Sequence, residues 1–397
     1  MAALPLLPER RDTLEQAIDL RCDLRNVLWL LGEFGQVFDH LCQAETLATA
    51  LDDQGRLGRV STYMAAYLWV MGEPDRSLVS GQRALAIAEA LGDVALQVEA
   101  NYRVGQAYLA LGDYRRAMAF LGRNVSSLQD HLIHERFGLP GIASVVSRSY
   151  LVWCLAELGE FTEGIARGEE AVRIAEAADH PFSLSNALFG VGFLYLRKGD
   201  LRNAIPTLER CLALCQRWNI ALWAPRNTSA LGSAYALSGR VAEALPLLEQ
   251  AIEHAASEKR LGEHALRVAA LSEASLLAGR TGDAFQTAQR ALALSREHKE
   301  RGHEAWALRL LGEITARRDP PDGEKAEAFY RQALVLADEL DIRPLLAHCH
   351  LGLGVLYMKI GQRQQARAEL SAALELYRTM DMTFWRTQVE AVLARMI

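Results

Sequence analysis

The sequence predicts an all-α fold, a solenoid of about nine helix-turn-helix repeats. Glycines recur in a single phase along the 397 residues. Five of their seven intervals are 40 residues, one is 47, and one is 82, which is two repeats with a slip of two residues. Between the glycines, apolar residues recur at helical spacing and no alternating, strand-like run competes with them. A fixed period of this length is typical of stacked helical hairpins. The glycines are Gly32, Gly72, Gly112, Gly159, Gly199, Gly239, Gly279 and Gly361.

The repeat that spans residues 192–214 shows how each unit is built. Gly192 and Tyr195 place a position without a side chain one helical turn from a large aromatic ring, so a neighbouring helix can approach closely there. Gly199 suits the left-handed backbone conformation that ends a helix. Ala204, after the turn, lets the second helix cross the first at short distance. Each unit is therefore expected to be a pair of antiparallel helices joined by a tight turn.

The repeats divide the chain into three parts, with two breaks in the rhythm. Residues 1–13 are expected to be an N-terminal flank, residues 14–381 the solenoid, and residues 382–397 a C-terminal capping helix. Near residues 122–147, seven extra residues are expected to lengthen a helix and then form a Pro-Gly turn. This segment is either a plain structural insertion or a binding loop. Residues 317–323 form an irregular, polar turn.

The repeating pattern of small residue, aromatic residue, turn glycine and alanine resembles the tetratricopeptide repeat (TPR) in a long form. The resemblance covers roughly residues 14–397. It implies a right-handed TPR α-solenoid whose concave face binds a protein or peptide segment. Members of this family that hold a C-terminal carboxylate use paired Lys and Asn on successive first helices. That pattern is not matched here, so a chaperone-tail adaptor is not expected.

Composition excludes several function classes. The formal net charge is −6 with both signs mixed along the chain, whereas a nucleic-acid scaffold needs a basic face. No run of 18 or more apolar residues occurs, so we expect no membrane span. The first 11 residues carry two prolines and no positive leading region, unlike a signal peptide. The six cysteines fall mostly at helical core phases, which indicates reduced thiols in a cytoplasmic protein.

A search for catalytic constellations gives no match to a phosphate-binding GxxxxGK[ST] loop, a GxSxG motif or an HExxH motif. His131 and His134 are three residues apart, and His348 begins a His-Cys-His run. Side chains so close on one helix do not converge on a metal by themselves. Cys211 and Cys215 either pack in the core or meet on one helix face. We therefore expect no enzyme activity, no cofactor and no metal.

The remaining candidate site is the concave groove, which the first helix of each pair lines in TPR arrays. Positions around the small residue of each first helix are predicted to face it. The N-terminal half of this set is aromatic with arginine, the composition of binding hot spots. The alternative is that half of these aromatic residues pack against the next layer. The predicted groove residues are Arg59, Trp69, Tyr102, Arg103, Gln106, Tyr150, Trp153, Asn186, Phe189, Phe193, Arg226, Arg309 and Glu313.

Residues 135–161 and 301–321, with the closing MDMTFWRTQVEAVL stretch, also resemble a narrower family. It is the C-terminal TPR region of bacterial signalling proteins that carry a class III adenylate/guanylate cyclase domain and an AAA-type ATPase domain. The resemblance implies a sensory or partner-binding region with no catalytic residues of its own. The chain is then expected to be a stand-alone gene product, a split gene product or a fragment of a longer protein.

Three functions follow as hypotheses. The first is a non-catalytic interaction scaffold that binds a partner segment in its concave groove. The second is a regulatory region of a nucleotide cyclase or ATPase, acting on a catalytic domain in cis or in trans, since a solenoid can shift a neighbouring domain between states. The third, an enzyme built on the groove, has no visible nucleophile–base pair or ligand set in its favour. The scaffold is the function that the repeat pattern and the aromatic groove favour.

Overall fold

A computed structural model describes residues 10–30, 33–220, 223–257, 260–318 and 322–396. Within these ranges the chain folds into nineteen α-helices and one short 3-10 helix, and none of the described residues forms a strand. None of the described helices combines the length and the apolar character that crossing a bilayer requires. The predicted all-α solenoid is confirmed.

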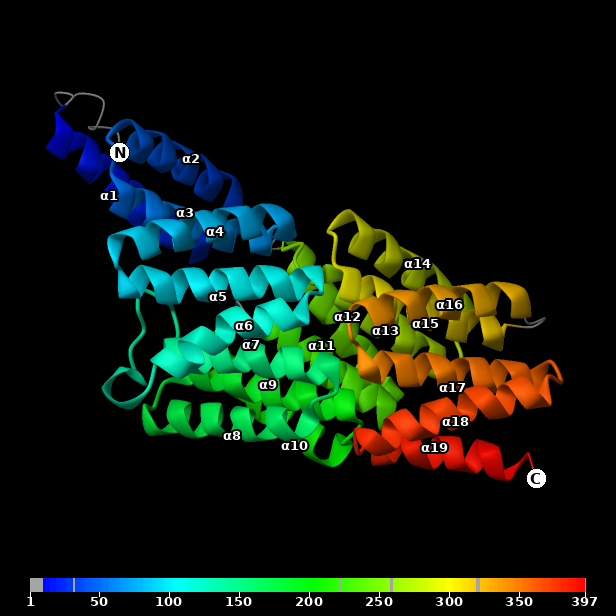
Figure 1. The fold of residues 1–397 in the computed structure, drawn as a ribbon. Coiled ribbons are helices and arrows are strands. Elements are labelled where there is room, and N and C mark those ends of the chain that lie inside the picture. Colours follow the sequence, from blue (N-terminus) through cyan, green and yellow to red (C-terminus); the bar gives the residue numbers. More distant parts are fainter. Residues whose placement is uncertain (1–9, 31–32, 221–222, 258–259, 319–321, 397) are drawn as a thin grey trace.

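The helices form nine antiparallel pairs followed by one terminal helix (Figure 1). The first helices of the pairs are α1 (Arg11–Leu30), α3 (Gln54–Val70), α5 (Val94–Leu111), α7 (Ala143–Leu158), α9 (Pro181–Lys198), α11 (Ala224–Leu237), α13 (His264–Leu277), α15 (Arg301–Arg317) and α17 (Arg343–Lys359). The second helices are α2 (Phe34–Ala50), α4 (Pro74–Leu91), α6 (Tyr114–Ser127), α8 (Phe161–Ala177), α10 (Leu201–Arg217), α12 (Val241–Ser257), α14 (Thr281–Glu297), α16 (Gly323–Glu339) and α18 (Arg363–Thr379). The terminal helix is α19 (Thr383–Ala394).

The repeated glycines do what the sequence predicts. Gly32 lies outside the described residues, and the other seven turn glycines have positive φ, for example 84° at Gly112 and 83° at Gly199, so each of these supplies the left-handed conformation that ends a first helix. Four glycines inside first helices each face a leucine of the second helix at such short range that a Cβ there would lie 2.6 to 2.7 Å from the leucine side chain. These pairs are Gly105 with Leu121, Gly192 with Leu208, Gly232 with Leu248, and Gly354 with Leu370.

This packing gives a stability prediction. Gly232→Ala should lower the free energy of unfolding by about 1–3 kcal/mol, because the added methyl group overpacks the contact with Leu248. Gly122→Ala is the matched control: it also lies inside a helix, but nothing stands within 4 Å of its added Cβ. That change should stabilise the protein by about 0.5–1 kcal/mol through helix propensity. Urea unfolding of both variants measures the difference; equal effects would contradict the account.

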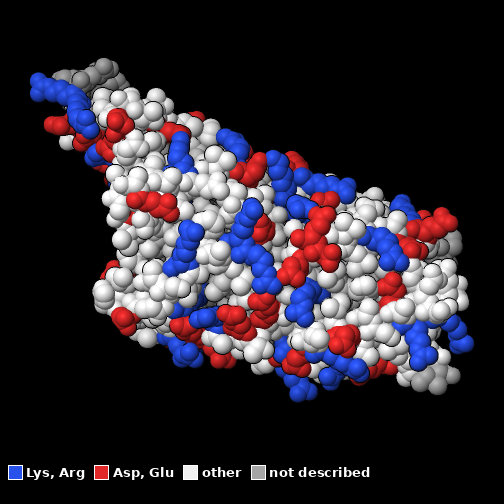
Figure 2. Space-filling model, viewed as in Figure 1, with Lys and Arg blue, Asp and Glu red and all other residues white. Residues whose placement is uncertain are grey.

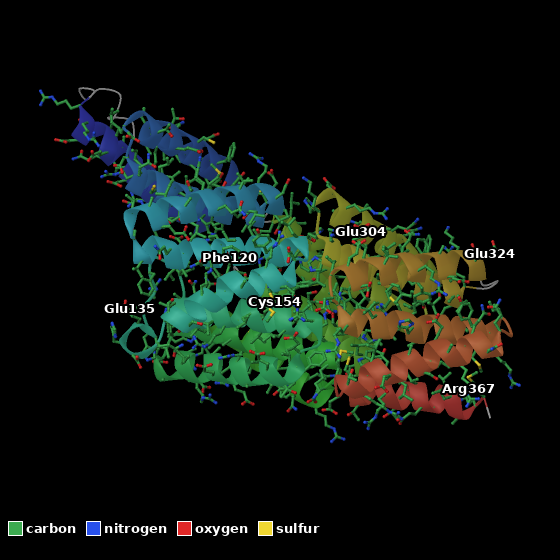
Figure 3. The ribbon with its side chains drawn as sticks, viewed as in Figure 1. Phe120, Glu135, Cys154, Glu304, Glu324 and Arg367 are labelled. Carbon is green, nitrogen blue, oxygen red and sulfur yellow. The ribbon has the colours of Figure 1, made fainter. Side chains whose placement is uncertain are left out.

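The segment between α6 and α7 differs from its prediction. α6 ends at Ser127, so the extra residues form an irregular segment with a 3-10 turn, η2 (Asp130–Leu132), and not a longer helix. The segment is held to the start of α7, where the Ala143 amide donates to the Glu135 carbonyl at 3.0 Å. Figure 3 labels Glu135 where this segment projects from the bundle. Leu139, only 1% exposed, ties the segment to the core.

Other predicted boundaries fall partly outside the described residues. Of the expected flank, residues 1–9 are not described, and α1 begins at Arg11. Of the expected irregular turn, residues 319–321 are not described; α16 then begins at Gly323, where the Asp322 carboxylate caps the helix by accepting from the Lys325 amide at 3.1 Å. The last helix runs over Thr383–Ala394, within the range expected for a C-terminal capping helix.

The superhelix closes on itself. The turns that follow the first helices of N-terminal repeats contact the segments that precede the first helices of C-terminal repeats. The Val70 carbonyl at the end of α3 accepts from the amides of Leu261 and Gly262, just before α13, at 3.1 and 3.0 Å. His298 Nδ1 lies 2.9 Å from the Gly72 carbonyl oxygen. Figure 1 shows the resulting arrangement, with the ends of α5 and α7 against the orange and red half of the chain.

Further along the same seam, buried and exposed polar contacts join the two halves. Glu157 of α7 is 1% exposed and accepts from Trp306 Nε1 of α15 at 2.9 Å. The same carboxylate accepts from Arg197 Nη2, also at 2.9 Å. At the rim, Lys198 donates to Asp381 at 2.9 Å. We call the Glu157–Trp306 and Lys198–Asp381 bonds the inter-turn contacts, since Arg197 and Glu157 belong to adjacent repeats. They turn the concave face of the solenoid into an interior space.

Candidate functional site

Arg226 of α11 is the centre of an aromatic cluster in this interior. It is 8% exposed, and its guanidinium lies within 6 Å of the ring centroids of five aromatic side chains. The five rings belong to Trp69, Tyr150, Trp153, Phe189 and Trp223. Cations over aromatic faces are attracted by the ring quadrupoles. The cluster joins side chains from α3, α7, α9 and α11.

A buried carboxylate neutralises this arginine. Glu263 is 4% exposed and accepts from Arg226 Nη2 at 2.6 Å and from Nε at 2.9 Å, the bidentate geometry that suits a guanidinium. The Tyr150 hydroxyl accepts from Nη1 at 3.2 Å. Burial opposes the charge of Arg226, but Glu263 and Tyr150 raise its pKa above the ordinary value. Arg226 is therefore a charged group held inside the protein.

The predicted groove residues divide into two sets by burial. The buried set comprises Tyr102, Gln106, Tyr150, Trp153, Asn186, Phe189, Phe193 and Arg226. The half-buried set comprises Arg59, Trp69, Arg103, Arg309 and Glu313. Many of the aromatic members touch one another, as Trp153 does with Phe193 at a centroid distance of 5.0 Å. Figure 3 labels Cys154, the neighbour of Trp153 on α7.

The polar members near the N-terminus pair within the chain. The Arg59 guanidinium is bonded to Asp19 of α1. Arg103 Nη1 donates to the side-chain oxygen of Gln106 at 3.0 Å, and the Gln106 amide donates to the Tyr102 hydroxyl at 3.0 Å. The Asn186 amide donates to a backbone carbonyl of its own helix at 2.9 Å. These side chains are thus engaged locally.

Two adjoining cavities lie on the concave side of the C-terminal repeats. The inner cavity has a volume of about 90 Å³ and the distal cavity about 310 Å³. Residues that line both are Leu237, Glu273, Arg309, His348 and Trp385. The inner cavity is also lined by Phe189, Phe193, Arg226, Leu266, Arg267, Ala269, Ala270 and Trp306, and the distal cavity by Leu276, Leu277, Glu313, Leu351, Val355 and Val392.

Arg309 of α15 lies where the two cavities adjoin. Its Nη2 donates to Glu273 at 2.7 Å and its Nη1 to Glu313 at 2.6 Å. Glu313 also accepts from Arg317 at 2.5 Å. A row of alternating charges therefore runs along walls that are otherwise mainly aliphatic and aromatic. An apolar hollow with a few fixed polar groups is the usual form of a binding site.

A third, smaller cavity opens beside the inner one, and we call it the side chamber. Its volume is about 40 Å³. Arg226, Glu263 and Arg267 line both the side chamber and the inner cavity. The chamber is also lined by Trp69, Val70, Trp223, Pro225, Ala255, Arg260 and Gly262. Burial lowers the pKa of Arg267 to about 10.

Some cavity residues were not predicted as groove residues, although the repeat register contains them. Ala269 and Ala270 stand before the small residue of α13, as Phe189 stands before Gly192 in α9. Their small side chains are neither aromatic nor charged, and these were the features that marked most of the predicted groove residues. Trp385 lies in the expected C-terminal capping helix and was not predicted as a groove residue, yet it lines both the inner and the distal cavity. Its position depends on closure of the superhelix, for which no local sequence signal exists.

His264, the first residue of α13, gives a pH-dependent prediction. It is 4% exposed, and desolvation lowers its pKa to about 4. Below an ordinary His pKa the unfolded chain then binds more protons than the folded one, so stability falls with falling pH down to about pH 4. Between pH 7 and 5 His264 should contribute a loss of about 1–2 kcal/mol. Urea unfolding at pH 7 and pH 5 measures this loss. Between these pH values the free energy of unfolding of His264→Gln should fall by about 1–2 kcal/mol less than that of the wild type. An equal fall in both proteins would contradict the prediction.

The described residues hold few groups arranged for chemistry. Within the described part of the chain, no three His, Cys, Asp or Glu side chains gather as a metal site would require. Cys211 donates to the Ser185 carbonyl at 3.1 Å, and burial raises the pKa of its thiol well above the ordinary value. Buried thiols of this kind are unreactive. On the face shown in Figure 2, basic and acidic side chains are interspersed.

The comparisons with known proteins agree with this architecture. Models of the tetratricopeptide repeat match residues 98–123, 185–217, 228–261 and 347–380. These segments fall on α5–α6, α9–α10, α11–α12 and α17–α18, so the chain contains tetratricopeptide repeats at four places. No curated protein sequence matches the chain significantly.

Several solved structures share the fold. A Rap protein complexed with competence and sporulation factor is 14% identical with a TM-score of 0.55, over 86% of this chain and 99% of that one. The Rap conjugation gene regulator of plasmid pLS20 in complex with the Phr* peptide is 14% identical with a TM-score of 0.57, over 93% and 96%. A signal transduction ATPase with a TPR sensor from Pyrococcus horikoshii is 13% identical with a TM-score of 0.50; this chain covers 54% of it. The chain is thus a TPR-like helical solenoid.

Proposed function

We propose that this protein is a non-catalytic scaffold that binds a protein or peptide segment inside its superhelix, in the inner and distal cavities. The observation that carries the proposal is the pair of adjoining hollows with apolar walls and the Arg309 charge row between them. Leu277, 40% exposed, and Phe384, 37% exposed, extend the apolar lining of the distal cavity toward solvent. A mixed apolar and charged lining suits a peptide better than a nucleic acid or a lipid.

The fold relatives support the same class of partner. Two of the solved structures with this fold are complexes, one of a Rap protein with competence and sporulation factor and one of a Rap conjugation gene regulator with the Phr* peptide. Identity of 14% to each carries over the fold alone. The peptide-binding proposal for this chain therefore depends on its own cavities.

The predicted groove residues take two roles in this proposal. Those that line a cavity contact the partner, while the others shape and support the wall behind them. The first group is Trp69, Phe189, Phe193, Arg226, Arg309 and Glu313. The second group is Arg59, Tyr102, Arg103, Gln106, Tyr150, Trp153 and Asn186.

The test is to fill the inner cavity. Peptides are selected from a random displayed library against the wild-type chain and then measured in solution. Ala270→Phe places a ring in the inner cavity and should weaken the selected peptides about tenfold or more, because a ligand and a side chain cannot occupy the same space. Ala242→Phe, on the exposed side of α12, is the matched control and should leave the affinity unchanged.

Both variants should keep the thermal unfolding midpoint of the wild type within a few degrees, so that lost binding is not lost folding. Undiminished binding by Ala270→Phe would place the peptides elsewhere and contradict the proposal. So would the same loss in Ala242→Phe, because that change lies outside both cavities.

A second candidate is favoured by one observation, the shared fold of the ATPase with a TPR sensor. In this version the scaffold is the sensory region of a bacterial signalling protein, and it regulates a nucleotide cyclase or ATPase domain in cis or in trans. Adding the chain to such a catalytic partner should change its turnover; no change at saturating amounts counts against it.

Six unpaired cysteines, five of them buried, support a cytoplasmic location for either version.

A further inference from the structure

The side chamber contains a buried cation, Arg267, that forms no ion pair with any carboxylate in the described part of the chain. Arg267 of α13 is 6% exposed. Its Nη2 donates to the Gly262 carbonyl at 2.9 Å, and its Nε has no hydrogen-bond partner. Among the described residues no carboxylate lies within ion-pair distance of this guanidinium. Buried charges in proteins are normally paired, so an unpaired one marks a place for a counter-charge.

The acidic groups nearest to Arg267 are already engaged. Glu263 makes its bidentate pair with Arg226. Glu300 accepts from the Glu263 amide at 2.7 Å and stands 2.9 Å from His303 Nδ1. The two carboxylates therefore have other partners, and neither turns toward Arg267 as a direct ligand.

A second buried donor in the chamber is also unpartnered. Trp223, at the start of α11, is 9% exposed, and its Nε1 has no hydrogen-bond partner among the described residues. The indole N–H is only a donor, so it needs an acceptor when buried. The chamber also lies at the N-terminal ends of α11 and α13, through Pro225 and Glu263, where backbone dipoles favour negative charge. The Arg267 guanidinium, the Trp223 indole N–H and the N-termini of α11 and α13 all favour an anionic oxygen as their partner.

We propose that the side chamber binds a carboxylate, supplied by the segment that occupies the inner cavity, through the guanidinium of Arg267 and the indole N–H of Trp223. This inference rests on the proposed function. Arg267 lines both spaces, so a carboxylate can enter the chamber while the rest of the segment stays in the inner cavity. The chamber, with a volume of about 40 Å³, has room for a carboxylate head. The rest of the wall holds Arg260 and apolar side chains that include Val70 and Ala255, a lining that suits a singly charged carboxylate better than the more strongly hydrated phosphate.

The first arm of the test uses acetate as the probe, titrated calorimetrically into the full chain against a chloride background of equal ionic strength. The wild type should bind acetate saturably. Arg267→Met, which keeps the length of the side chain without its charge, should weaken binding at least tenfold. Trp223→Phe removes the indole donor and keeps an aromatic ring, although a smaller one, and should weaken binding severalfold. Arg202→Met, an exposed arginine of α10, is the matched control and should match the wild type.

Arg267→Lys guards against a folding defect, because it keeps the charge and loses the planar fork; it should bind acetate with intermediate affinity. Absence of saturable acetate binding to the wild type overturns the inference. Equal acetate binding by the wild type and Arg267→Met overturns it as well.

The second arm uses peptides selected against the wild-type chain. Each is compared with versions whose Asp or Glu residues are replaced by Asn or Gln and whose C-terminus is amidated. Removing the relevant carboxylate should weaken binding about tenfold in the wild type and hardly at all in Arg267→Met. If the selected peptides bind with no carboxylate dependence, the inference fails while the proposed function stands. If acetate binds through Arg267 but no peptide binds the cavity, the chamber is a site for free anions. In that case the bound segment is not the source of the carboxylate, and the proposed function fails as well.

Discussion

Replacing Arg226 with methionine is expected to lower the free energy of unfolding by about 3–5 kcal/mol, the cost of leaving a buried charge without its partner. Glu263 is 4% exposed and would lose both hydrogen bonds to the guanidinium. The change would also remove the cation from the aromatic cluster and the donor to the Tyr150 hydroxyl. Urea unfolding at neutral pH measures the loss.

The control for this prediction is the double variant Arg226→Met with Glu263→Leu. Replacing both members of a buried ion pair with apolar groups is often close to neutral. The double variant should therefore recover most of the stability that Arg226→Met loses. If the double variant were less stable than the single one, the pairing of these two residues would not be the source of the effect.

Glu157→Leu is expected to cost about as much, again about 3–5 kcal/mol, for a related reason. Its carboxylate accepts from Arg197 of α9 and from Trp306 of α15, and both donors would lose their partner. Because Trp306 comes from the far end of the superhelix, the variant should also open the closed structure. Its radius of gyration by small-angle X-ray scattering should rise, while its helix content by circular dichroism should stay constant.

Lys198→Met is the comparison for Glu157→Leu. It breaks another of the inter-turn contacts, the one between Lys198 and Asp381, but Asp381 is exposed. Exposed ion pairs contribute about 0–1 kcal/mol, so this variant should be nearly as stable and as compact as the wild type. Equal effects of the two variants would show that burial at Glu157 is not what holds the turns together.

The sequence predicts the repeats because their signals are local. Gly105, Gly192, Gly232 and Gly354 each meet a leucine sixteen residues later, a contact inside one unit. The turn glycines likewise act within their own helix ends. Register and pairing of helices therefore follow from the 40-residue period alone.

Closure of the superhelix could not be predicted in the same way. It results from small rotations that accumulate over several repeats, and each rotation depends on side-chain volumes at an interface. Val70 meets Gly262, and Glu157 meets Trp306, although no short motif links them. Tyr102, Tyr150 and Trp153, predicted either to face the groove or to pack against the next layer, lie in a packed interior, with each side chain at most 4% exposed.

The binding cavities show the same division between local and distant signals. Arg309 and Glu313 were predicted as groove residues from their place in α15, and they line the distal cavity. Ala269 and Ala270 leave space in the inner cavity because their side chains are small. Aromatic and charged residues are recognisable as binding anchors in a sequence, whereas such small residues are not. The unpaired state of Arg267 depends on which carboxylates other residues engage, and this is a property of the folded chain.

The most direct test of the binding proposal is amide hydrogen exchange of the wild-type chain with and without a selected peptide. Binding inside the superhelix should slow exchange on the first helices that line the cavities, above all α11, α13, α15 and α17. The second helices α12, α14 and α16 should exchange as they do in the free protein. Slowed exchange confined to those second helices would place the partner on the outer surface and contradict the account.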